Sequence, residues 1–228
     1  VMSSASVPCP YPIGLLHSPS ATVKLGGSLP DLTDLASRLD RLRSDWGERP
    51  LLVVGGGCAA DLVREWVQQH QLGESRSHWL ALDSLELTSR LLVQLWPVAR
   101  IAPITDIEAC WQLGQVPVIR ARDWFEFAEQ ASIPAPPQNW DTTTDTIAAW
   151  VAELSRSAAL WLLKSVEPPT SLAEAAELAL VDANFTAWAP RDIPLQWVNL
   201  RRDLSVTTPE LHASSKSLTT TPCTSVRR

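Results

Sequence analysis

The sequence predicts an α/β protein, a three-layer α/β/α sandwich around an open and mainly parallel sheet. Short apolar runs, each the length of a strand, alternate with longer segments that show helical spacing. The runs are apolar throughout, which suits strands that are covered on both faces. Strands that alternate with helices are typical of βαβ units, in which the strands lie parallel. With 228 residues, 45% of them hydrophobic, the chain can bury the core of one such domain.

Five apolar runs are the predicted strands. They lie at residues 21–25, 51–54, 116–119, 158–163 and 196–200. Between the first two runs, a helix is indicated by a stripe of leucines: Leu32, Leu35, Leu39 and Leu42. After the second run, a similar stripe predicts another helix: Leu62, Val63, Trp66 and Val67. A third helix is expected after the proline-rich loop 133–139, where hydroxyl and carboxyl groups of residues 142–145 can cap its first turn.

The two ends of the chain differ in composition from its middle. Residues 1–20 are rich in Ser and Pro, and residues 205–228 are dominated by Ser and Thr. We therefore expect both ends to be disordered and one domain to span residues 21–204. The first positively charged side chain is Lys24, and prolines interrupt the segment before it. A signal peptide or membrane span is not expected, and a cytoplasmic protein is.

Charge and cysteine content exclude several classes of protein. The formal net charge is -6 and no cluster of Lys and Arg exists, which argues against a nucleic-acid partner. The four cysteines are far apart and form no CxxC pair, so we expect neither a disulfide framework nor a metal site. The eleven tryptophans fit core packing or the interface of a homo-oligomer.

Two glycine-rich segments stand out. Gly26-Gly27-Ser28 and Gly55-Gly56-Gly57 contain five of the nine glycines, and each follows a predicted strand. Glycine lets backbone N–H groups approach a ligand closely, and a helix that follows adds its N-terminal partial charge, so both segments suit phosphate groups. The P-loop pattern GxxxxGK[ST] and the dinucleotide pattern GxGxxG are both absent.

Four segments in order resemble the amino acid kinase superfamily. They are residues 24–28 after the first strand, residues 55–57 after the second, residues 144–149 at the start of a helix, and residues 162–164 at the end of a later strand. The resemblance covers about residues 21–200. It implies the amino acid kinase fold and an enzyme that uses ATP to phosphorylate a small phosphorylated or carboxylated substrate, with Mg²⁺ held mostly by nucleotide oxygens.

The resemblance also implies roles for individual residues. Lys24 would reach the transferred phosphoryl group from the acceptor side and Lys164 would bind the donor phosphates, while Asp145 would hold both ammonium groups. A further set would bind the nucleotide and the phosphates: Gly26, Gly27, Ser28, Gly56, Gly57, Thr144 and Thr146.

Within the superfamily, the sequence is most similar to the kinases that act on aminomethylfuran-methyl phosphate in methanofuran synthesis. Residues 139–141 and 144–149 carry most of this likeness. It implies a small, flat, cationic phosphomonoester as acceptor, for which Trp140 offers an aromatic face and Asp141 a carboxylate. The implied acceptor contacts are Gly55, Asp61, Arg64, Asn139, Trp140 and Asp141.

Other interpretations stay open at this point. After Lys164, residues 165–169 replace the Asp-containing, glycine-ended turn of the family. As alternatives, the acceptor is a nucleoside monophosphate, isopentenyl phosphate or an amino-acid carboxylate, or the chain is a non-catalytic member that binds nucleotides or anions. Each residue also has a structural interpretation, since glycines form turns, Asp145 can cap a helix and a lysine can be a solvated charge.

Overall fold

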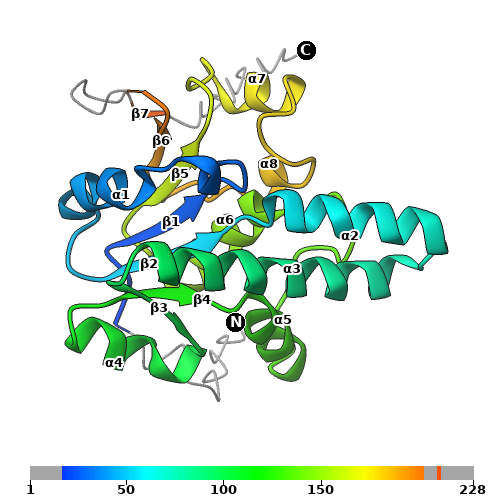
Figure 1. The fold of residues 1–228 in the computed structure, drawn as a ribbon, viewed down its shortest axis with the longest axis horizontal. Coiled ribbons are helices and arrows are strands. Elements are labelled where there is room, and N and C mark those ends of the chain that lie inside the picture. Colours follow the sequence, from blue (N-terminus) through cyan, green and yellow to red (C-terminus); the bar gives the residue numbers. More distant parts are fainter. Residues whose placement is uncertain (1–16, 203–209, 212–228) are drawn as a thin grey trace, which may run out of the picture.

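A seven-stranded sheet forms the centre of the protein. The computed structural model describes residues 17–202 and 210–211, and within them the strand order is β3-β4-β2-β1-β5-β6-β7 (Figure 1). The first six strands run parallel, and β7 pairs antiparallel with β6 at one edge. The strands are β1 (Ala21–Leu25), β2 (Pro50–Val54), β3 (Ala99–Ala102), β4 (Val116–Ile119), β5 (Leu160–Lys164), β6 (Leu195–Asn199) and β7 (Glu210–Leu211).

The five predicted strands are confirmed to within two residues at each end. The sequence pattern missed β3, which lies at the other edge of the sheet and has two of its four residues, Arg100 and Ile101, partly or fully exposed. An edge strand needs less apolar sequence than a central one, so a periodicity search does not find it. The strand β7 lies inside the range 205–228 that we expected to be disordered. Residues 1–16, 203–209 and 212–228 lie outside the described residues.

Helices cover both faces of the sheet. The larger ones are α1 (Leu35–Arg43), α2 (Gly57–His70), α3 (Glu74–Leu95), α5 (Ala121–Gln130) and α6 (Thr144–Ser155). Shorter ones are α4 (Ile107–Gln112), α7 (Leu172–Glu177) and α8 (Phe185–Trp188), with single 3-10 turns at Leu29–Asp31, Ser44–Trp46 and Ile104–Asp106. The predicted three-layer α/β/α sandwich is therefore confirmed.

The strands divide their side chains between two hydrophobic clusters, one on each face. In β2, Leu51 and Val53 belong to the cluster that contains α5 and α6, whereas Leu52 and Val54 belong to the cluster that contains α1. This is the period of two that a strand imposes on its side chains. Each such fully buried aliphatic side chain contributes about 1.5–3 kcal/mol.

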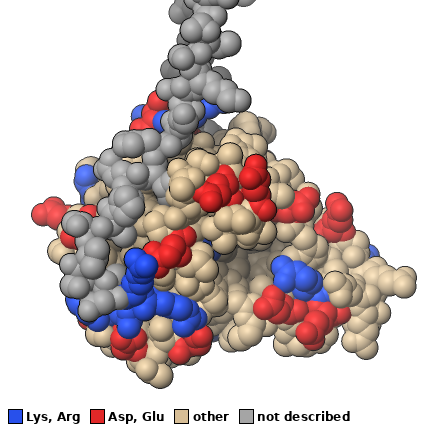
Figure 2. Space-filling model, turned by 90° about the horizontal axis from the view of Figure 1, so that it is seen from above, with Lys and Arg blue, Asp and Glu red and all other residues tan. Residues whose placement is uncertain are grey.

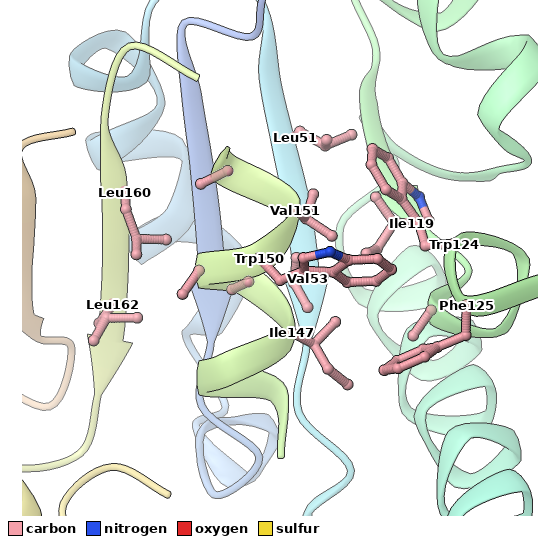
Figure 3. Packing of buried hydrophobic residues seen from close by; sticks show 14 of the residues in the cluster. Leu51, Val53, Ile119, Trp124, Phe125, Ile147, Trp150, Val151, Leu160 and Leu162 are labelled. Atoms are coloured by element: carbon pink, nitrogen blue, oxygen red, sulfur yellow. The ribbon is translucent and has the colours of Figure 1, made fainter. Parts of the chain in front are cut away.

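Helix α6 lies in the middle of one layer and is buried along most of its length. Ile147, Trp150 and Val151 lie between the sheet and the aromatic side chains Trp124 and Phe125 of α5 (Figure 3). The rings of Phe125 and Trp150 have centroids 5.0 Å apart. Because sheet and helices enclose α6, its first turn has a fixed position at the carboxyl edge of the strands.

Helices α2 and α3 run side by side away from the sheet (Figure 1). The apolar stripe predicted for α2 is only partly buried, since Val63 is covered while Leu62 and Trp66 are 45% and 47% exposed. Helix α2 packs mainly on α3, and one neighbouring helix cannot cover a broad stripe. No helix within the described residues has the length and apolar composition needed to cross a membrane.

Acidic and basic side chains lie in small separate groups on the face shown in Figure 2.

Six of the eleven tryptophans are buried in the two clusters, as expected for core packing: Trp46, Trp96, Trp111, Trp124, Trp150 and Trp197.

The two glycine segments pack against each other, backbone on backbone. A Cβ atom on Gly27 would lie 2.4 Å from the N atom of Gly57, and one on Gly55 would lie 2.5 Å from the N atom of Gly27. Gly57 also has a φ of +52°, a conformation that other residues rarely adopt. Glycine is therefore required here to bring the ends of β1 and β2 together, whatever the ligand.

We predict that Gly27→Ala destabilises the fold by about 1–3 kcal/mol, the usual cost of forcing extra atoms into a packed site. The matched control is Gly73→Ala, where no atom lies within 4 Å of the added Cβ. This control should change the free energy of unfolding by less than about 1 kcal/mol. Urea unfolding of both variants measures the difference, and equal effects would contradict the proposed backbone contact.

Candidate functional site

Two lysines approach the same helix because of strand alternation. In β1, Ala21, Val23 and Leu25 face the cluster of α1, so Lys24 points to the opposite face, towards α6. In β5, Leu160 and Leu162 lie on the α6 face, and Lys164, two residues further, points the same way. Since β1 and β5 are parallel neighbours, both side chains reach the carboxyl edge of the sheet together.

Asp145, the second residue of α6, lies between the two ammonium groups. Its Oδ1 atom is 2.9 Å from Lys24 Nζ, and its Oδ2 atom accepts a hydrogen bond of 2.7 Å from Lys164 Nζ. All three residues are at least 92% buried, and two of the chain's three lysines are in this cluster. With both lysines charged, the cluster has two positive charges and one negative charge. A buried surplus of positive charge is a place for an anion.

Lys164 is held more fully than Lys24. Its Nζ atom also donates to the backbone oxygen of Leu180 at 2.7 Å and lies 5.3 Å from the ring centre of Trp197. For Lys24, the contact with Asp145 is the only ion pair found among the described residues, and no hydrogen bond to a backbone oxygen is found. The Lys24 ammonium therefore keeps donors for a ligand.

Burial and charge act in opposite directions on the pKa values of this cluster. Burial by itself would raise the pKa of Asp145, but Lys24 and Lys164 outweigh it and hold that pKa below its ordinary value. For Lys164, burial and the neighbouring Lys24 lower the pKa to about 8, although Asp145 opposes them. Asp145 is therefore ionised at neutral pH, and Lys164 titrates just above neutral pH.

The glycine amides divide into two groups. The N–H groups of Gly26 and Gly55 donate to Leu163 and Leu25 and so continue the sheet. No hydrogen bond among the described residues engages the N–H groups of Gly27, Gly56 or Gly57. These three amides remain for a ligand, beside the start of α2, whose partial positive charge favours anions.

A cavity of about 70 Å³ lies beside Gly56, between α2, α3 and the segment that leads into α6. Arg64 of α2 stacks on the ring of Trp140, with its guanidinium carbon 4.8 Å from the ring centre. The Trp140 Nε1 atom is buried and has no hydrogen-bond partner. The remaining lining is Ala60, Ala81, Leu82, Leu85, Asn139, Thr142, Thr143, Thr144 and Ile147. The cavity lining thus combines apolar side chains with those of Arg64, Asn139 and three threonines.

Comparison with known proteins finds the architecture but no sequence relative. No family model matches the sequence, and a search of curated proteins gives no significant match. Uridylate kinase from Archaeoglobus fulgidus superposes with a TM-score of 0.56 at 17% identity, over 78% of this chain and 90% of its own. UMP kinase from Ureaplasma parvum gives a TM-score of 0.55 at 12% identity, over 82% and 92%. Aspartate kinase from Synechocystis gives 0.55 at 16% identity, over 85% and 41%.

The chain has the amino acid kinase fold. At these identities the likeness establishes the architecture, and any activity has to be inferred from the site. The fold brings together residues from β1, the β2–α2 turn, α6 and β5, because the carboxyl ends of parallel strands lie at one edge of the sheet. Ligands of open α/β sheets bind at this edge.

The structure places most of the expected site residues at this edge of the amino acid kinase fold. Arg64, Asn139, Trp140, Thr144 and Gly56 line the cavity. The others are placed differently. Ser28 Oγ donates to Ser165 Oγ at 3.1 Å, and Asp61 forms an exposed ion pair with Arg64 at 2.7 Å. Asp141 does not line the cavity, and Thr146 donates both its N–H and its hydroxyl to Asp182.

Sequence reasoning missed two residues near the site, Asp182 and Asn184. They lie between α7 and α8, far along the chain from α6, and touch the residues on either side of Asp145. No motif marks them, since a single carboxylate and a single amide in a loop have no distinguishing pattern. The cap that we expected from residues 142–145 comes instead from Asp182, because Thr143 makes no side-chain cap of its own.

The described residues contain no group of three or more His, Cys, Asp or Glu side chains suited to a metal ion. His78 is buried against Phe125, with ring centres 4.8 Å apart, and burial lowers its pKa to about 4. A neutral, enclosed imidazole of this kind serves packing.

We predict that one lysine titrates at about 8, because Lys164 has this lowered pKa. Since the chain has only three lysines, NMR of ¹³C-labelled lysine resolves them one by one. Asp145→Asn should move the transition of Lys164 to still lower pH, because the opposing carboxylate charge is lost.

The same shift has a consequence for stability. Between about 8 and 10.5, the unfolded chain keeps a proton on this lysine that the folded protein has released. Because the unfolded state then binds more protons, this group's contribution to stability rises with pH across that window. A Lys164 transition near 10.5 would contradict the buried arrangement.

Proposed function

We propose that this protein is an ATP-dependent kinase that transfers the γ-phosphoryl group to a small anionic acceptor, a phosphomonoester. The observation that carries this proposal is the buried cluster of Lys24, Asp145 and Lys164, with its surplus positive charge beside the free amides of Gly27 and Gly56. Phosphoryl transfer requires mainly positioning and neutralisation of negative charge, and the cluster supplies both.

The structural neighbours agree with this class of reaction. They are named as uridylate, UMP and aspartate kinases, so the amino acid kinase fold is found both with phosphomonoester and with carboxylate acceptors. The fold alone does not choose between the two types of acceptor, and the cavity beside Gly56 has to decide.

The donor site suits the triphosphate of ATP, since its surplus positive charge and its amides without a partner lie at the same edge of the sheet. Bound ATP would supply the phosphoryl group, and Mg²⁺ would come with the nucleotide oxygens. Lys24, which has donors to spare, would contact the group in transfer from the acceptor side. Lys164 would neutralise the donor phosphates, and Asp145 would keep the two ammonium groups apart and in place. Burial strengthens each of these interactions.

The acceptor cavity favours an anion with a small neutral body. Its lining offers the guanidinium of Arg64, the amide of Asn139 and the hydroxyls of Thr142 and Thr144 as donors, and no carboxylate lines it. The structure gives less support to a cationic acceptor of the aminomethylfuran type, because Arg64 already covers the face of Trp140 and Asp141 lies outside the lining. Aminomethylfuran-methyl phosphate therefore stands beside uridine monophosphate and isopentenyl phosphate as a compound to be compared.

A screen of phosphomonoesters for Mg²⁺-dependent ADP formation tests the proposal. We expect turnover with at least one of them, and Lys24→Ala should lower kcat about 100-fold or more while the protein stays folded. A folded Lys24→Ala enzyme with nearly normal kcat would refute the assignment. Nucleotide binding without turnover for any phosphomonoester or carboxylate would indicate a non-catalytic member of the fold.

Arg64 should determine affinity for the acceptor. We predict that Arg64→Ala raises the KM for the acceptor about 10-fold or more, the scale of a lost charge-assisted hydrogen bond, with little change in the KM for ATP. The control is Arg90→Ala, which removes an exposed arginine of α3 whose ion-pair partner is Glu86. Equal KM values in both variants would show that Arg64 only packs on Trp140.

A further inference from the structure

Asp182, in the segment between α7 and α8, fills the place that an anion would take at the start of α6. Its Oδ2 atom accepts from Thr143 N at 3.0 Å, from Thr143 Oγ1 at 2.7 Å and from Thr146 N at 3.0 Å. Its Oδ1 atom accepts from the hydroxyl of Thr146. One carboxylate therefore satisfies two backbone donors of the first turn and opposes the partial positive charge of a twelve-residue helix.

These bonds fix the backbone on both sides of Asp145. Thr143 precedes it by two positions and Thr146 follows it directly, so the turn that carries the Asp145 side chain is tied at both ends. Asp145 itself spends its carboxylate on the two lysines and contributes nothing to the cap. No hydrogen bond or ion pair among the described residues joins Asp182 to either lysine, so its side chain reaches the cluster through the turn that carries Asp145.

The same segment reaches two further parts of the site. The backbone oxygen of Leu180 accepts from Lys164 Nζ, and Asn184 Nδ2 donates to Thr142 Oγ1 at 3.0 Å on the wall of the acceptor cavity. Residues 180–184 thus contact the donor-side lysine, the start of α6 and the acceptor wall. A segment with these three contacts can set the distances between Lys164, the start of α6 and the wall of the acceptor cavity.

We propose that Asp182 is a positioning residue, which holds the first turn of α6 so that the Asp145 carboxylate stays between Lys24 and Lys164. Its effect on catalysis rests on the proposed kinase function, whereas its effect on the arrangement of the lysines does not. The N–H and hydroxyl of Thr146 are consequently taken by Asp182 and are not available to donor phosphates.

The test uses Asp182→Ala, Asp182→Asn and the control Glu174→Ala. Glu174 is a close match, because its carboxylate also accepts from the N–H and hydroxyl of one threonine, Thr170, at the start of a helix, but it lies on α7 and contacts neither lysine. In Asp182→Ala, the Lys164 transition measured by lysine NMR should move down by about half a unit or more, because Asp145 is no longer held against it.

In the active enzyme, Asp182→Ala should lower kcat about 10-fold or more with small changes in both KM values. Asp182→Asn should recover part of both effects, since an amide oxygen can still accept from the threonines. Glu174→Ala should leave the lysine titration and kcat unchanged. If Asp182→Ala does not fold, the Thr143→Val and Thr146→Val double variant removes the two hydroxyl hydrogen bonds to Asp182 from the helix side. It should show the same downward shift of the Lys164 transition.

A lower melting temperature with unchanged Lys164 titration and unchanged kcat would overturn the proposal and leave Asp182 as a helix cap. The two levels of inference remain separable. An inactive wild-type protein would contradict the proposed kinase function, and the NMR titration of the same variants would still decide the role of Asp182.

Discussion

One buried carboxylate shared by two buried ammonium groups is the constraint on which the rest of the structure depends. Lys24 and Lys164 can meet Asp145 only because β1 and β5 are parallel neighbours and α6 lies across them. Removing Asp145 would leave two buried ammonium groups without a counter-charge, which costs several kcal/mol. Asp145 therefore holds the two ammonium groups and does not cap its helix, and a neutral replacement is expected to cost stability as well as activity.

The glycines serve packing and binding at different positions of the same segments. Gly26 and Gly55 spend their N–H groups on the sheet, and Gly27 and Gly57 allow the two turns to touch without a Cβ between them. The glycine cluster can thus be explained by steric requirements alone, and only the amides without a partner, those of Gly27, Gly56 and Gly57, argue for anion binding.

Specificity in this fold has to come from the walls around a common centre. The cavity beside Gly56 is bordered by α2 and α3, the pair of helices that projects from the sheet, and by residues 139–144. Arg64 stacks on Trp140 in this wall and brings a positive charge, which also pairs with the exposed Asp61. The charge of the wall, more than its aromatic content, argues for an anionic acceptor.

The sequence by itself determined the layers and five of the strands, because apolar periodicity is a local signal. Lys24, Asp145 and Lys164 were indicated by the resemblance of short segments to the amino acid kinase superfamily. It also indicated the cavity residues Arg64, Asn139 and Trp140. Tertiary structure alone decided which donors are free, that α2 leaves Trp66 exposed, and that Asp182 caps α6 from a segment 36 residues away. Such contacts join positions distant in the chain, and their geometry depends on the packing of the whole domain, which no local pattern encodes.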